Sequence, residues 1–153
     1  MGLSCPCARN ICLPHGHAKM QLVFALHDAI KRLSLDLVVL SEVSIDMRPR
    51  SMPMPDVFLS RIGRGTAAVP SDAVSLIAEV SSSTQDVDAG PKALLYAEQR
   101  VPEYWLVDVA AGVVTRMWKP GRNGYEQRNQ VQFGAALESA TIPGLRVETA
   151  DFR

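Results

Sequence analysis

Val74-Ser-Leu-Ile-Ala-Glu-Val-Ser81 has the pattern of a buried strand with a carboxylate near its end. One face of this segment is almost wholly apolar, and on the other face Glu79 follows Ile77. An ionised acid in such surroundings needs a partner, because burying an unpaired carboxylate is costly or raises its pKa. The segment therefore predicts either a metal-bound carboxylate or an ion pair to an arginine such as Arg48 or Arg61.

A second carboxylate stands just upstream, where the proline-rich run Met52-Pro-Met-Pro-Asp56 leads into a short predicted strand over 56–60. If this strand pairs with 74–81, the carboxylates of Asp56 and Glu79 can point to one place, where a hard divalent cation would bridge them. The plainer interpretations are a turn residue after proline for Asp56 and an ion-paired strand end for Glu79.

Lys92 supplies a positive charge downstream, in the first turn of a helix that is predicted to begin near Pro91. The helix macrodipole disfavours a cation at this position, which suggests that the lysine serves another purpose. Tyr96 follows four residues later on the same helix face. An ammonium beside two acids suits the water and the crowded phosphate of phosphodiester hydrolysis. The alternative is a solvated surface lysine.

The other segments predict an α+β protein. Apolar residues at helical spacing indicate a helix from Lys19 to about Leu33, and an alternating pattern indicates one long strand from Leu35 to Met47. Further strands are predicted over 103–108, 113–118 and 125–131, the last two joined by Pro-Gly and Asn-Gly turn signals, and a closing edge segment over 142–147.

Length and composition suit one compact domain, since 153 residues of which 47% are hydrophobic can build a core without disulfides. Sixteen Lys and Arg balance sixteen Asp and Glu, which argues weakly against a strongly basic nucleic-acid binder. Four arginines on either side of Asp56 could form a basic rim for a phosphate, although solvated loop arginines explain them equally well: Arg48, Arg50, Arg61 and Arg64.

The N-terminal region holds a group of metal-binding residue types, namely Cys5, Cys7, Cys12, His15 and His17. Their spacing does not match the paired Cys-x-x-Cys of zinc modules, and terminal segments are often disordered. We therefore expect 1–13 to be a poorly ordered segment with reduced thiols and 14–153 to form one domain, with a soft-metal site as the alternative. Without a signal peptide or a bilayer-length apolar run, the chain is predicted to be cytoplasmic and to contact no membrane.

Taken in order, these residues resemble the bacterial Uma family of proposed endonucleases, within the PD-(D/E)XK restriction-endonuclease-like superfamily. The matching motifs are Pro55-Asp56-Val, Glu79-Val-Ser-Ser-Ser-Thr, Asp88, Lys92-Ala-Leu-Leu-Tyr96-Ala and Val101-Pro-Glu-Tyr-Trp-Leu-Val-Asp108. The resemblance covers roughly Pro14 to the C-terminus. It implies a restriction-endonuclease-like core of a helix, an antiparallel strand meander, a second helix and a further strand, which a C-terminal antiparallel hairpin would extend in this chain.

The resemblance also implies an activity, a metal-dependent endonuclease that hydrolyses phosphodiester bonds in DNA, in a superfamily whose nucleases are often homodimers. Asp56 and Glu79 match the two family acids and would hold Mg²⁺ or Mn²⁺. Many superfamily members have a lysine at the position of Ser81. In the Uma family the lysine lies on the following helix instead, and Lys92 matches it. Two departures are the Cys-rich start in place of the usual opening segment, and Pro91 before the lysine. A catalytically silent binding or assembly module with the same fold is the rival hypothesis.

Overall fold

A computed structural model of the chain describes residues 13–61, 65, 67–81 and 89–153. The helices are α1 (Leu13–Leu33) and α2 (Ala89–Glu98), with short 3-10 turns at Ser71–Ala73 and Ala150–Phe152. The strands are β1 (Val38–Leu40), β2 (Ile45–Asp46), β3 (Val57–Ser60), β4 (Val69–Pro70), β5 (Val74–Ser81), β6 (Glu103–Asp108), β7 (Val113–Gly121), β8 (Gly124–Gln132), β9 (Ala136–Glu138) and β10 (Arg146–Glu148). The predictions for Cys5, Cys7, Cys12, Arg64 and Asp88 fall outside the described residues.

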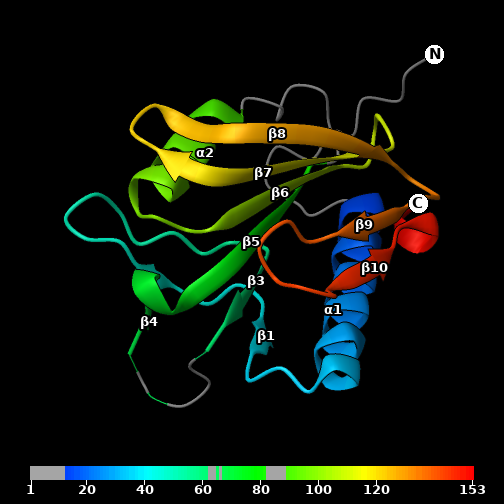
Figure 1. Cartoon of the computed structure of the whole chain (residues 1–153), viewed down its shortest axis with the longest axis horizontal. Coiled ribbons are helices and arrows are strands. Elements are labelled where there is room, and N and C mark those ends of the chain that lie inside the picture. The colour runs from blue at the N-terminus through cyan, green and yellow to red at the C-terminus, as the bar shows by residue number, and fades with distance from the viewer. Residues whose placement is uncertain (1–12, 62–64, 66, 82–88) are drawn as a thin grey trace.

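A six-stranded mixed sheet in the order β1-β3-β5-β6-β7-β8 forms the centre of the molecule (Figure 1). β1, β3 and β5 form an antiparallel meander, β6 runs parallel to β5, and β7 and β8 form a long antiparallel hairpin. The parallel pairing of β5 with β6 needs a crossover connection, and α2 lies in that connection. The α+β class, the meander and the hairpin predicted from the sequence are therefore confirmed.

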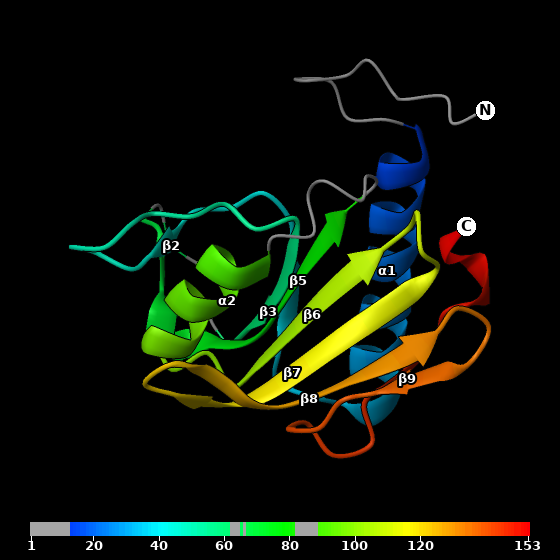
Figure 2. The same cartoon turned by 90° about the horizontal axis from the view of Figure 1, so that it is seen from above.

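The two helices cover opposite faces of this sheet (Figure 2). α1 buries Leu22 and Leu26 against the face of β5 that presents Leu76 and Ala78. The opposite face of β5 presents Ile77, which packs in a second apolar cluster that includes residues of α2. Glu79 shares the face of Ile77, because side chains alternate along a strand. The carboxylate therefore points to the α2 side of the sheet.

Two boundary predictions for residues before β3 were wrong. α1 begins at Leu13, well before the predicted start at Lys19, and Pro14 occupies its first turn, where proline is tolerated. The single strand predicted over 35–47 is broken into β1 and β2, since Glu42 adopts a left-handed φ of 55° and donates its backbone N–H to Pro55 O at 3.1 Å. This turn directs β2 away from the main sheet to pair with β4.

The C-terminal region differs from the predicted closing edge segment, because β10 pairs with β9 in a separate two-stranded sheet beside α1 (Figure 1). The loop between these strands is tied to the main sheet by Glu103, a fully buried residue at the start of β6. Its carboxylate accepts hydrogen bonds from Trp105 Nε1 at 2.7 Å, Ala140 N–H at 3.0 Å and Thr141 Oγ1 at 2.8 Å.

Neither helix of the described part is long and apolar enough to cross a membrane.

Candidate active site

The antiparallel pairing of β3 with β5 brings the two predicted acids together. Val57 lies opposite Ala78 in this ladder, so Asp56, which immediately precedes β3, comes beside Glu79, near the end of β5. Asp56 N–H donates to Glu79 Oε2 at 3.3 Å, and Val80 N–H donates to Asp56 Oδ2 at 2.8 Å. These reciprocal bonds hold both carboxylates at one end of the paired strands β3 and β5.

α2 brings a cation and a phenol to the same carboxylate. Lys92 Nζ lies 3.2 Å from Glu79 Oε1, and Tyr96 Oη donates to that oxygen at 2.7 Å. Lys92 and Tyr96 are one helical turn apart, so both project from the helix face that covers β5. The Lys92 side chain is 60% exposed whereas that of Glu79 is 9% exposed. The ammonium therefore lies at the solvent side of a buried acid.

Electrostatics around Glu79 favour its protonated form. Burial raises the pKa of this carboxyl, Lys92 opposes the rise, and the negative charge of Asp56 adds to it. The phenol of Tyr96 is held protonated, because burial and the neighbouring Glu79 charge both raise its pKa. Ionising Glu79 beside a second carboxylate is costly. A cation bound between the two acids would offset this cost.

The carboxylate oxygens at this end of the strands are suitable ligands for a hard divalent cation. Asp56 and Glu79 can supply two carboxylates, and within the described residues Asp56 Oδ1 accepts no hydrogen bond. In the same part of the chain no three His, Cys, Asp or Glu side chains form a metal-binding group. Mg²⁺ is commonly held by one or two carboxylates, with waters and substrate phosphates as its other ligands. Two protein carboxylates are therefore sufficient for this ion.

Sequence reasoning assigned no active-site role to the residues that surround Asp56. His15 Nε2 lies 3.4 Å from Asp56 Oδ2, and Ser41 Oγ donates to Asp56 O at 2.7 Å. On the next turn of α1, Lys19 Nζ contacts Glu42 Oε1 at 2.9 Å. The i, i+4 spacing of His15 and Lys19 could have indicated a shared helix face, but the predicted helix began only at Lys19.

The two N-terminal histidines, His15 and His17, have different partners. His17 Nε2 lies 3.0 Å from Asp151 O, whereas His15 contacts Asp56. These different partners do not favour the soft-metal alternative for His15 and His17, and the cysteines of that alternative lie outside the described residues.

The three described arginines that could have formed a basic rim around Asp56 have other partners. Arg48 pairs with Asp46 at 2.6 Å, and Arg50 pairs with Glu98 at 3.0 Å. Arg61 Nη2 donates to the backbone oxygen of Asp72 at 3.0 Å. Hydrogen bonds from Arg48 lower the pKa of Asp46 to about 2. The basic-rim interpretation is therefore not supported for these three residues, and the cation paired with Glu79 is Lys92 instead of an arginine.

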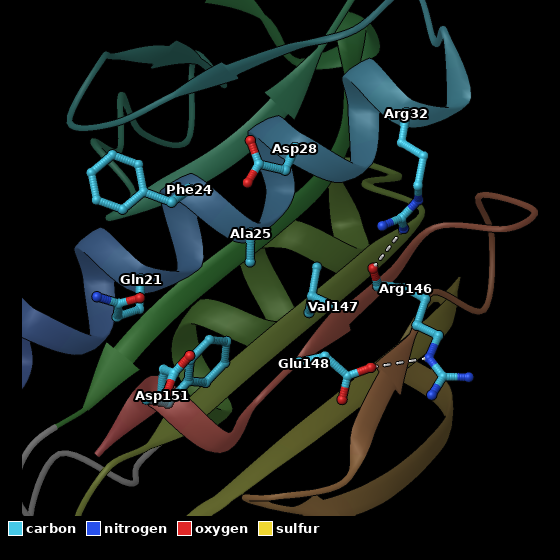
Figure 3. Close-up of a pocket in the computed structure, with 10 residues that line it drawn as sticks. Gln21, Phe24, Ala25, Asp28, Arg32, Arg146, Val147, Glu148 and Asp151 are labelled. Atoms are coloured by element: carbon cyan, nitrogen blue, oxygen red, sulfur yellow. Dashed lines mark hydrogen bonds and ion pairs between the residues drawn. The ribbon is translucent and has the colours of Figure 1, made fainter.

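A hollow of about 420 Å³ lies apart from these carboxylates, between α1 and β10 (Figure 3). Its walls include Phe24 and Asp28 from α1. On one side of the hollow, Arg32 donates a hydrogen bond to the backbone oxygen of Arg146, and the Arg146 side chain donates one to Glu148 (Figure 3). None of the predicted site residues lines this hollow, so it is distinct from the carboxylate cluster.

Comparison with known proteins bears on the family and the fold. The family model described as "Uma2: Putative restriction endonuclease" matches residues 13–150. A solved structure, the crystal structure of a putative nuclease belonging to DUF820 from Anabaena variabilis ATCC 29413, superposes with a TM-score of 0.66 at 15% identity. The match covers 91% of this chain and 79% of that chain, and at this identity it shows the fold alone. No curated protein matches the chain.

Proposed function

The chain belongs to the family described as "Uma2: Putative restriction endonuclease", and on this premise we propose that it is a metal-dependent endonuclease that hydrolyses phosphodiester bonds in DNA. One observation carries the proposal. The buried Glu79 carboxylate is bonded to the backbone of Asp56 and is contacted by the exposed Lys92 ammonium, so three distant parts of the chain form one connected cluster.

Asp56 and Glu79 would hold Mg²⁺ or Mn²⁺ through carboxylate oxygens. When bound, such an ion polarises a phosphoryl oxygen and lowers the pKa of a coordinated water. The protein residues fix where this happens. Val80 N–H holds Oδ2 of Asp56, which leaves Oδ1 without a hydrogen bond from the described residues. Tyr96 and the Asp56 N–H fix the Glu79 carboxylate through Oε1 and Oε2. Preorganised ligands of this kind need no rearrangement when the substrate arrives.

Lys92 would bind the phosphate and stabilise the negative charge that develops on it. Its ammonium lies at the solvent side of the cluster, where a large substrate can reach it. Pro91 precedes it inside the first turn of α2, and Lys92 still comes within 3.2 Å of Glu79. The proline therefore does not prevent the helix from presenting the lysine to the acids.

The test is DNA cleavage with Mg²⁺ or Mn²⁺ by the full chain and by Asp56→Ala, Glu79→Gln and Lys92→Ala. We expect cleavage by the wild type and a loss of about 10²–10³-fold in each variant. Asp28→Ala is the matched control, because this acid is exposed on α1 and its side chain is 79% accessible. It should cleave like the wild type. Equal cleavage by the wild type and Asp56→Ala would refute the proposal.

The rival, a catalytically silent module with this fold, is favoured by the neutral net charge. Titration with Mn²⁺ separates the two proposals. An endonuclease should bind the ion and lose it in Glu79→Ala, whereas a silent module should show no binding that depends on Glu79.

A further inference from the structure

The first turn of α1 places a histidine against the carboxylate of Asp56. His15 Nε2 lies 3.4 Å from Asp56 Oδ2, and the two side chains are only 15% and 18% exposed. The other ring nitrogen, Nδ1, is buried and has no hydrogen-bond partner among the described residues. Asp56 is therefore the polar group of the described chain that His15 contacts.

The next turn of α1 supports the backbone that carries Asp56. Lys19 is almost buried, with a side chain 11% exposed, and its ammonium lies 2.9 Å from Glu42 Oε1. Glu42 in turn donates its backbone N–H to Pro55 O, and Ser41 Oγ donates to Asp56 O. Two successive turns of one helix thus contact the Asp56 side chain and the turn that holds its main chain. This arrangement restricts both the position and the rotation of the acid.

We propose that His15 is a positioning residue of the metal centre, which acts by holding Asp56 Oδ2 so that Oδ1 faces the cation. This inference rests on the proposed function, since it needs Asp56 to be a metal ligand. Val80 N–H and His15 both approach Oδ2, and this leaves Oδ1 as the oxygen with no hydrogen bond in the described part of the chain. Residues that contact a metal ligand and orient it, without touching the metal themselves, contribute about 10–100-fold to metal affinity.

His15 is assigned to Asp56 and not to the cation for a structural reason. Its imidazole approaches the oxygen that Val80 already holds, and no group of three His, Cys, Asp or Glu side chains within the described residues is arranged to hold a metal. A direct ligand and a positioning residue respond differently to substitution. A glutamine amide can still contact Oδ2 of Asp56, whereas its oxygen would replace imidazole nitrogen poorly in the coordination shell.

The experiment measures Mn²⁺ binding to the full chain by calorimetry and by the loss of the free-ion electron paramagnetic resonance signal. His15→Ala should raise the Kd by about 10–100-fold, and His15→Gln should restore most of the affinity. The matched control is His27→Ala, an exposed histidine on the same helix whose polar contact within the described residues is with Asp28. Its Kd should equal that of the wild type. Circular dichroism and Tm establish that each variant is folded.

Other outcomes overturn the inference. Wild-type affinity in His15→Ala means that the histidine does not position Asp56, and equal weakness in folded His15→Ala and His15→Gln means that it acts other than through Oδ2. If His15→Ala does not fold, His15→Asn takes its place, because its shorter amide cannot reach Oδ2 and should bind Mn²⁺ more weakly than His15→Gln. Failure of the wild type to bind any Mn²⁺ refutes the proposed function as well, so the two failures are distinguishable.

Discussion

At the scale of single residues, burial and hydrogen bonding place conflicting demands on the Glu79 carboxylate. It is buried beside Asp56, yet it is the residue to which Asp56, Lys92 and Tyr96 are all bonded. Burial raises its pKa, so the metal-free protein is less stable when this acid is ionised. Active sites often carry such a cost, because the geometry that suits a ligand does not suit the empty protein.

This conflict predicts a pH dependence. The raised pKa means that the native state keeps the Glu79 proton to higher pH than the unfolded state does. The free energy of unfolding therefore falls as pH rises from the ordinary carboxyl pKa of 4.5 through the raised native value. Glu79→Gln has no such proton. The Tm of this variant relative to that of the metal-free wild type should rise with pH across this window and then level off.

Thermal unfolding without divalent ions, from pH 4 to about pH 8, checks this. Asp28→Asn serves as the control for the removal of a surface carboxylate, since the Asp28 side chain is 79% exposed. A Glu79→Gln difference that is flat or that shrinks as pH rises would contradict the assignment.

At the scale of elements, the start of β6 is joined to the loop after β9 by one carboxylate. Glu103 is fully buried, and its oxygens accept hydrogen bonds from Trp105, Ser139, Ala140 and Thr141. Five backbone and side-chain donors of these residues would lose this acceptor if the carboxylate were removed. The β9–β10 sheet, which packs beside α1, depends on that loop for its position.

Glu103→Ala should therefore lower the free energy of unfolding by about 3 kcal/mol or more, because it leaves several buried donors unsatisfied. Urea unfolding measures the change. Glu126→Ala, an exposed acid on β8, is the control and should change stability by less than about 0.5 kcal/mol. A Glu103→Ala loss as small as that of the control would show that the carboxylate does not anchor the loop.

At the scale of the whole molecule, the candidate site exists only in the folded state. Asp56 precedes β3, Glu79 lies in β5, Lys92 lies in α2, and α1 adds His15 from the opposite side of the sheet. An unfolded chain cannot bring these groups together, so a cation that binds them stabilises the native state alone.

Mn²⁺ at about 100 times its Kd should raise the free energy of unfolding by about 2.7 kcal/mol and increase Tm accordingly. Differential scanning calorimetry with and without the ion measures this increase. Asp56→Ala should show no increase at the same concentration. An equal increase in both proteins would place the bound ion elsewhere in the molecule.

Local sequence determined the elements whose residues repeat with a clear period. β5 and β6 have the bounds that alternation and β-branched or aromatic content predicted. The reason is that the side chains of a strand alternate between two faces along its whole length. The motif order and the alternation together predicted that Asp56 and Glu79 would meet. Their roles, and that of Lys92, remain predictions that cleavage and metal binding will test.

Only the tertiary structure decided where the period fails and which distant side chains touch. The break at Glu42 depends on a bond to Pro55, and the contact of His15 with Asp56 depends on how α1 packs across the sheet. Hydrophobic periodicity specifies which face of an element is buried. It does not specify which polar group from another element arrives there, because that is set by strand register and helix packing over the whole chain.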